Sequence, residues 1–314
     1  MASLDLKFAM IFLFQMLIGI LGNFSLLHHY LSLYLSGYRS KSTDLILRHL
    51  TLTNSLVILS RGIPETLAAF GVTHFLQDFG CKLIFYVHRV ARGVSMSTTS
   101  LLSIFQAITI SPMNSRWAGL KARAAKYIGP SNILCWILNI LLNIRVPEYT
   151  TDKLSNKTLS KTIDFGYCIS ELHDKDTDLL YILLTSTHDV LCLGLMTWAS
   201  GTMVSILCRH KQRVQHIHGT KVSPRSSPEI RATQSILVLV TTFVSFYTFS
   251  SIVHIYFFIF CKTTSWVMNT SALINACFPT ASPFVFLSSD QRVSRFFLVC
   301  TGRHKQFLHP FRAT

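Results

Sequence analysis

Seven long runs of mostly apolar residues, separated by polar segments, dominate the chain. Each run reaches the roughly 20 residues that an α-helix needs to cross about 30 Å of hydrocarbon. The runs cover residues 8–35, 45–71, 82–110, 130–150, 179–207, 232–260 and 264–287. This pattern predicts an all-α membrane protein, in which residues 1–314 form a single seven-transmembrane helix bundle and residues 288–314 form a cytosolic tail.

The composition supports a membrane protein and explains the strong positive charge. Charged residues make up only 14% of the 314 residues, whereas about a quarter of the residues in a soluble domain are charged. The net charge is +15, and eighteen of the 29 Lys and Arg residues fall on one side of the predicted bundle, against eight on the other. The positive-inside rule then places the amino terminus outside and the carboxyl terminus in the cytosol. The basic residues therefore mark the orientation of a multi-pass protein, expected in the plasma membrane, and do not indicate nucleic-acid binding.

The longest connection, residues 151–178, is polar and is expected on the outer side. It contains an Asn-Lys-Thr acceptor pattern, so Asn156 is a predicted glycosylation site. It also contains Cys168, and Cys81 stands at the outer end of the third run, where an oxidising compartment allows disulfides to persist. A bridge between Cys81 and Cys168 would hold the loop over the mouth of the bundle. Cys261 lies on the same predicted side and is an alternative partner.

The third run carries a polar stripe along one side of its helix. At 100° per residue, six polar residues fall within about 40° of Cys81: His88, Arg92, Ser95, Thr99, Ser103 and Gln106. Polar side chains gain nothing by facing lipid, so the stripe should face the interior of the bundle. At 1.5 Å per residue, His88 and Arg92 lie roughly 10 to 17 Å below Cys81. This depth suits a ligand pocket that opens to the outside.

Intramembrane charges are costly, so each is a functional-site hypothesis. Glu65 on the second run and Asp189 on the fifth are candidate counter-ions at the depth of Arg92, and His188 and His254 add titratable groups. In one interpretation, these residues bind a ligand together with His88 and Arg92. In the other, Arg92 and Arg89 pair with the two acids only to lock the helices, or Arg61 pairs locally with Glu65. Both interpretations stay open at the level of sequence.

The sequence contains no established catalytic, nucleotide-binding or metal-binding motif. The segment Gly-Val-Ser-Met-Ser at 93–97 fails the G-x-S-x-G pattern at its last position, and neither H-E-x-x-H nor a P-loop occurs. We therefore expect no enzymatic activity, no cofactor and no metal. A secondary transporter is the alternative function, since it would also use intramembrane charges, but such proteins are built from repeats and the chain shows none.

Several long segments resemble one receptor family. Seven spans, an outer amino terminus, a disulfide from the third span to the second outer loop and a basic cytosolic rim resemble a G-protein-coupled receptor. Four segments are similar to the vomeronasal type 1 (pheromone) receptors: GCKLIFYVHRVARGVSMSTTSLLSIFQAITISPMNSRWAGLKARAAKYIG, HDVLCLGLMTWASGTMVSILCRHKQRVQHIH, SPRSSPEIRATQSILVLVTTFVSFYTFSSI and NTSALINACFPTASPFVFLSSDQRVSRFF. The resemblance covers nearly the whole chain.

The same segments depart from the commoner rhodopsin-like receptors. Gln106 stands where the Arg of an acidic-Arg-Tyr triplet would end the third span, and Asn54 replaces the usual Asp of the second span. The resemblance implies a small chemosensory ligand, such as an odorant or pheromone, and an inhibitory-type heterotrimeric G protein. The G protein would meet the inner ends of spans three, five and six, where Gln106, Arg213 and Arg231 lie. The basic inner loops would also face anionic membrane lipid.

Overall fold

Long apolar segments form helices because a helix satisfies its own backbone hydrogen bonds where no water is present. The structure is a computed structural model, and it describes residues 2–37, 42–72, 75–112, 118–151, 162–165, 167–171, 175–218, 236–238, 240–246, 248–249 and 265–289. Its long helices are α1 (Ala2–Leu35), α2 (Ser42–Ala69), α3 (Asp78–Ile110), α4 (Ala118–Leu142), α5 (Lys175–His218) and α7 (Ser265–Ser289). Residues 236–238 and 240–246 are also helical.

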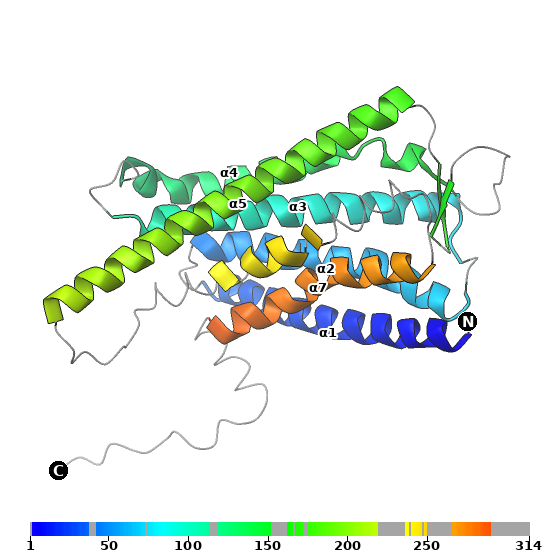
Figure 1. Cartoon of the computed structure of the whole chain (residues 1–314), viewed down its shortest axis with the longest axis horizontal. Coiled ribbons are helices and arrows are strands. Elements are labelled where there is room, and N and C mark those ends of the chain that lie inside the picture. The colour runs from blue at the N-terminus through cyan, green and yellow to red at the C-terminus, as the bar shows by residue number, and fades with distance from the viewer. Residues whose placement is uncertain are drawn as a thin grey trace, which may run out of the picture.

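The described part of the chain is an elongated helix bundle. In Figure 1, α1, α2, α3 and α7 run side by side, and α5 crosses them obliquely. Within the described residues, four stretches are long and apolar enough to cross a bilayer: 7–35, 78–110, 123–148 and 179–209. Their outward faces carry many exposed large apolar side chains, such as Phe14, Leu134 and Val190. This distribution is typical of a bundle that is surrounded by lipid.

The predicted fourth run, 130–150, differs from the observed helix. α4 begins at Ala118 and ends at Leu142, and the chain continues into the 3-10 helix η1 (Val146–Glu148). Pro147 lies in the first turn of η1, and a proline lacks the N–H that a continuing α-helix would require. The apolar residues after 142 therefore lie beyond the end of α4, in the segment that leads to the β-sheet.

The second difference from the sequence prediction is a small β-sheet, because only helices were expected. The strands β1 (Thr150–Thr151), β2 (Thr162–Asp164) and β3 (Ile169–Glu171) form an antiparallel sheet in the order β1-β3-β2. Thr150 pairs with Ser170, and Ile163 pairs with Ser170 on the opposite edge. The sheet lies at the same end of the bundle as the start of α1 (Figure 1).

The largest cluster of buried apolar side chains lies in the half of the bundle away from the sheet. It takes residues from every long helix, including Leu26, Leu50, Met96, Met203 and Phe286. α1 packs tightly on α2 and α7 at Gly19, where an added Cβ would lie 2.6 Å from Ile58 Cδ1 and 2.9 Å from Thr280 Oγ1. The glycine is therefore required by the close approach of three helices.

Candidate functional site

The polar stripe of α3 faces the interior, as the helical wheel predicts. Ser95, Thr99, Ser103 and Gln106 are all buried, whereas Arg89 is exposed. The hydroxyls of Thr99 and Ser103 donate to carbonyls one turn earlier, at 2.7 and 2.8 Å. These bonds satisfy the buried hydroxyls within their own helix, so the deeper part of the stripe needs no ligand.

Uncharged side chains of α2, α3 and α7 form a hydrogen-bond network near the middle of the bundle. The Asn54 side chain of α2 donates through Nδ2 to Ser282 Oγ of α7 at 2.9 Å. Its Oδ1 accepts a hydrogen bond from Ser95 Oγ of α3 at 2.8 Å. All three residues are buried. A neutral amide can both donate and accept, so Asn54 links two hydroxyls and satisfies both.

A hydrogen bond to a proline carbonyl links α1 to α7. Pro283 has no N–H, so it cannot donate to the carbonyl of Pro279, four residues earlier in α7. Asn23 Nδ2 of α1 donates to this carbonyl at 2.9 Å, and Ser282 Oγ donates to it at 3.4 Å. Side chains thus satisfy a carbonyl that the helix itself leaves without a donor.

An ion pair joins α3 to α5 in the half of the bundle nearer the β-sheet. Arg92 Nη1 lies 3.8 Å from Asp189 Oδ2, and about a quarter of each side chain is exposed. His188 Nδ1 lies 3.3 Å from Asp189 Oδ1, and its Nε2 lies 3.0 Å from Ser97 Oγ of α3. Asn139 Nδ2 of α4 donates to the same Ser97 hydroxyl at 3.2 Å. Charged and neutral polar groups from three helices therefore form one connected network.

The second predicted acid, Glu65, pairs with a different arginine. Arg61 Nε lies 3.3 Å from Glu65 Oε1, one turn away on the same helix, and Glu65 is buried. His88 of α3 lies beside this pair, with its Nδ1 at 3.4 Å from Ser60 Oγ. Of the interpretations that the sequence left open, the structure contains the local pairing for Glu65 and the interhelical pairing for Arg92.

Two adjacent cavities open onto these residues. The first, here called the central cavity, lies between α2, α3, α7 and the helical residues after 236, and it is lined by Val57, His88, Arg92, Ser95, Phe243, Phe246, Ile274, Asn275, Phe278 and Pro279. One wall is aromatic, since the rings of Phe243 and Phe278 meet edge to face at 4.4 Å. The lining of this cavity therefore combines a basic group, Arg92, with aromatic side chains.

The second cavity, here called the α1–α7 cavity, lies between α1, α2, α3 and α7. It is lined by Phe12, Gln15, Met16, Val57, Ile58, Arg61, Gly62, Glu65, His88, Ala272, Asn275 and Ala276. His88, Val57 and Asn275 line both cavities. The two spaces are therefore neighbours with a shared wall.

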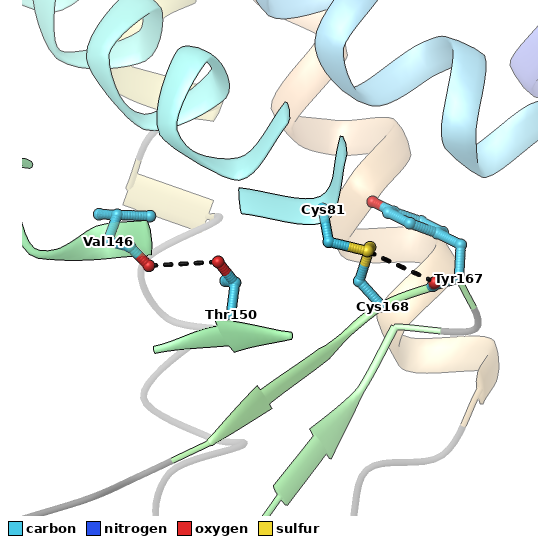
Figure 2. Close-up of a disulfide and its surroundings, with 5 residues drawn as sticks. All are labelled: Cys81, Val146, Thr150, Tyr167 and Cys168. Carbon is cyan, nitrogen blue, oxygen red and sulfur yellow. Dashed lines mark hydrogen bonds between the residues drawn. A yellow bond between two sulfur atoms is a disulfide. The ribbon is translucent and has the colours of Figure 1, made fainter. Parts of the chain in front are cut away.

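A disulfide joins the β-sheet to the start of α3, beside the end of α2. Cys81 is bonded to Cys168, with Cα atoms 5.9 Å apart, and the sulfur of Cys81 lies next to the carbonyl oxygen of Tyr167 (Figure 2). Tyr167 is buried against the disulfide, and the rings of Phe165 and Tyr167 pack on Phe85 at 5.0 and 6.1 Å. Burial, with the nearby Glu65 carboxylate, raises the pKa of Tyr167, so its phenol stays protonated.

Some predicted site residues fall outside this geometry. Gln106 is buried near the opposite end of α3. Arg213 lies on α5, and its side chain is outside the described part, as are residues Asn156, Arg231, His254 and Cys261. Within the described residues, no group of three His, Cys, Asp or Glu side chains is placed to hold a metal ion.

Sequence reasoning missed several contributors to the site. Gln15 of α1, Ser97 of α3, Asn139 of α4 and Asn275 of α7 all line the cavities or join the network. An Asn or Gln within an apolar membrane span is the signal that could have identified three of them, because such residues form interhelical hydrogen bonds.

The whole chain is similar to known receptors. Residues 6–299 match the model of the vomeronasal organ pheromone receptor family. The human Vomeronasal type-1 receptor 2 is 55% identical over 300 residues, which cover 96% of this chain and 76% of the relative. The human Vomeronasal type-1 receptor 3 is 54% identical over 308 residues, which cover 98% of each chain. The crystal structure of squid rhodopsin superposes with a TM-score of 0.73 at 13% identity, covering 100% of this chain and 88% of the rhodopsin, which shows a rhodopsin-like fold.

Proposed function

Because the chain belongs to the vomeronasal type-1 receptor family, we propose that it binds a small chemosensory molecule in the central cavity and passes the signal to a heterotrimeric G protein. The family and the fold make it a chemosensory receptor of the G-protein-coupled class and a multi-pass membrane protein. The observation that carries the ligand site is Arg92, whose partly exposed guanidinium lines the central cavity beside Asp189.

The chemistry of the central cavity favours a ligand with an apolar body and a hydrogen-bond acceptor. Arg92 is always charged and presents several N–H donors. Its distance of 3.8 Å from Asp189 Oδ2 is longer than a charge-assisted hydrogen bond, which is typically 2.7 to 2.9 Å. A ligand acceptor that approaches Arg92 would therefore compete with a long contact to Asp189. His88 lines the same cavity, and His188 connects Asp189 to Ser97. His254 and Glu65 complete the proposed set of ligand-site residues.

Ligand binding would act by shifting the population between two arrangements of the helices. The Arg92–Asp189 pair joins α3 to α5, so a ligand that contacts Arg92 changes the balance of forces between these two helices. Their inner ends carry Gln106 and Arg213, and Arg231 precedes the helical residues after 236. We place an inhibitory-type G protein at these inner ends, and anionic lipid against the basic loops. In this proposal the chain spans the plasma membrane seven times, with the amino terminus outside, a glycan on Asn156 and residues 288–314 in the cytosol.

A double-mutant cycle on Arg92 and Asp189 tests the ligand site. An agonist is first selected from a panel of volatile aldehydes, alcohols, acids and steroids by a cyclic-AMP readout, normalised to surface expression. If Arg92 contacts the agonist, Arg92→Gln should raise the half-maximal concentration about 10- to 100-fold, since a hydrogen bond to a charged group contributes about 1.5 to 3 kcal/mol. Arg92→Lys should restore the response only in part, because an ammonium group cannot reproduce a forked donor.

The control variants separate ligand contact from a helix lock. Arg89→Gln removes a neighbouring exposed charge from the same helix and should leave the response unchanged. If Arg92 only locks α3 to α5, Asp189→Asn combined with Arg92→Gln should recover the full response, because no buried charge is then left without its partner. Such a recovery, or an unchanged response in Arg92→Gln alone, would contradict the proposed contact.

A further inference from the structure

The outward face of α5 carries a large groove, here called the α5 groove. Its volume is about 520 Å³, and among the described residues its lining comes from α5 alone, between Thr197 and Arg209. This volume is many times the roughly 30 Å³ that one water molecule occupies in the liquid. On the other side of the same helix, Met196, Ala199 and Met203 are buried in the largest apolar cluster. The α5 groove therefore faces away from the core of the bundle.

Small residues line the α5 groove at every fourth position. Thr197, Gly201 and Ser205 follow one another by about one helical turn, so they lie on the same side of α5. A Cβ added to Gly201 would meet nothing within 4 Å. Trp198 and Ile206 lie beside this row, and Trp198 is 49% exposed. The row of small residues leaves a strip along the helix in which an extended apolar chain can lie.

The hydroxyl groups of the α5 groove already have acceptors. Thr197 Oγ1, Thr202 Oγ1 and Ser205 Oγ each donate to a carbonyl four residues earlier in α5, at 2.7, 3.0 and 2.8 Å. A hydrocarbon chain can therefore cover these hydroxyls without leaving a donor unsatisfied.

A cation lies at one end of the α5 groove. Arg209 is exposed, and it is the last residue of the stretch 179–209, which is long and apolar enough to cross a bilayer. No hydrogen bond or ion pair joins it to another described residue. Arg209 therefore lies where a spanning helix reaches the lipid headgroups. A phosphate group is a suitable partner there, because a guanidinium can bind it through two parallel N–H groups.

The length of the α5 groove matches one leaflet of a bilayer. Thr197 precedes Arg209 by twelve positions, which is roughly 18 Å at 1.5 Å per residue. Half of the hydrocarbon core measures about 15 Å. A lipid whose headgroup lies at Arg209 can therefore extend an acyl chain along the groove as far as the middle of the bilayer.

A second copy of the chain fits this face less well. Two copies related by a twofold axis along the membrane normal would bring their Arg209 side chains to the same depth. The two positive charges would repel each other across the contact. An anionic headgroup at Arg209 produces attraction instead.

We propose that the α5 groove is a binding site for an anionic glycerophospholipid, whose headgroup phosphate contacts Arg209 and whose acyl chain lies along Thr197, Gly201 and Ser205. In the orientation of the proposed function, Arg209 meets the inner leaflet, which is negatively charged because it holds the anionic lipids. The inference rests on that orientation and does not require a chemosensory ligand.

Trp198 provides a local readout, because bromine atoms on an acyl chain quench a tryptophan that they contact. The full-length receptor is reconstituted into phosphatidylcholine vesicles that contain phosphatidylserine with the same acyl chains, and equal shares of one lipid or the other are brominated. The chain has four tryptophans, so the fluorescence of Trp198→Phe is subtracted from that of the wild type. We expect phosphatidylserine to be preferred about 5-fold, which corresponds to about 1 kcal/mol for one basic residue at the membrane surface.

Matched variants locate the preference. Arg209→Gln should remove most of it, whereas Arg123→Gln, which removes an exposed cation at the start of the spanning stretch 123–148, should keep it. Gly201→Leu fills the groove and leaves Arg209 in place. It should reduce the preference, because a lipid that cannot place its chain is not held with its headgroup at Arg209. Gly194→Leu adds the same volume at an equally open position outside the groove and should behave as the wild type.

Equal quenching by the two lipids in the wild type would overturn the proposed lipid site, as would a preference that Arg209→Gln leaves unchanged. Quenching by neither lipid would also overturn it, since that result is expected if a second copy covers Trp198. High salt is a check that needs no variant, because screening should weaken the preference and an unaffected preference would contradict the role of Arg209. An absent cellular response to agonists would argue against the proposed function alone, because the vesicles contain neither agonist nor G protein.

Discussion

Gly93 brings α3 and α4 into close contact, and replacing it tests how tightly this part of the site is built. A Cβ atom at position 93 would overlap Asn139 Oδ1 and lie 2.8 Å from Asn139 Cγ. Asn139 cannot move without loss, because its Nδ2 donates to Ser97 Oγ at 3.2 Å and to the Cys135 carbonyl at 2.9 Å. We therefore expect Gly93→Ala to displace the Asn139 side chain and to break at least one of these bonds.

The expected loss of unfolding free energy follows from the overpacking and from the broken hydrogen bond. Overpacking of a closely packed interior costs roughly 1 to 3 kcal/mol. A broken hydrogen bond adds about 1 kcal/mol. The intrinsic helix preference of alanine over glycine offsets about 0.5 to 1 kcal/mol of this loss. The free energy of unfolding should therefore fall by roughly 1 to 3 kcal/mol.

The assay is unfolding of the purified receptor from mild detergent by added SDS, followed by tryptophan fluorescence. The matched control is Gly201→Ala in α5, where an added Cβ meets nothing within 4 Å. This control should be as stable as the wild type or more stable by up to about 1 kcal/mol.

The Asn139→Ala background removes the clash, because the two Cβ atoms would then lie 3.6 Å apart, an ordinary contact. In that background Gly93→Ala should cause no further loss, so the two changes should be strongly non-additive. If Gly93→Ala is as harmless as Gly201→Ala, or costs the same with and without Asn139, the packing argument is wrong.

Two further predictions concern the outer side. Cys81→Ser and Cys168→Ser should each reduce surface expression or ligand response to the same degree. The double variant should be no worse, because all three variants remove the same single bond. Additive losses, measured by surface labelling and dose-response curves, would contradict this. Asn156 should carry a glycan, so glycosidase treatment should increase the electrophoretic mobility of the wild type but not of Asn156→Gln. Cleavage near Arg213 by external protease on intact cells would contradict the proposed orientation.

The sequence predicted which residues face the interior best where a polar or apolar periodicity extends over a long segment. The polar stripe of α3 repeats along nearly the whole helix, so its inward face could be predicted from the sequence alone, and the buried Ser95 and Gln106 confirm it. The bounds of α4 could not be predicted as well. Apolar residues continue after Leu142, and only Pro147 marks the change to a 3-10 turn. Hydropathy does not distinguish an apolar connecting segment from the end of a span.

The contribution of α1 could not be predicted for a different physical reason. Gln15 is the only polar residue of α1 between Lys7 and Asn23, so no periodic polar stripe marks it. Its role depends on which residues of α7 it meets, more than 250 positions away in the chain. Asn139 is a similar case, since its importance comes from Gly93 and Ser97 on another helix. Contacts of this kind follow from the packing of the helices and not from a local pattern.

The polar contacts of α3 also differ in how easily a ligand could rearrange them. The bonds between Asn54, Ser95 and Ser282 are 2.8 to 2.9 Å long and fully buried, so breaking them would leave unsatisfied groups in the interior. The Arg92–Asp189 pair is longer, at 3.8 Å, and about a quarter of each side chain is exposed, so in the proposed function a ligand at Arg92 would compete with a weaker contact. The neutral network therefore holds α2, α3 and α7 together near the middle of the bundle. In the proposed function, the charged network of Arg92 and Asp189 is the part of α3 that a ligand would change, and its partner helix is α5.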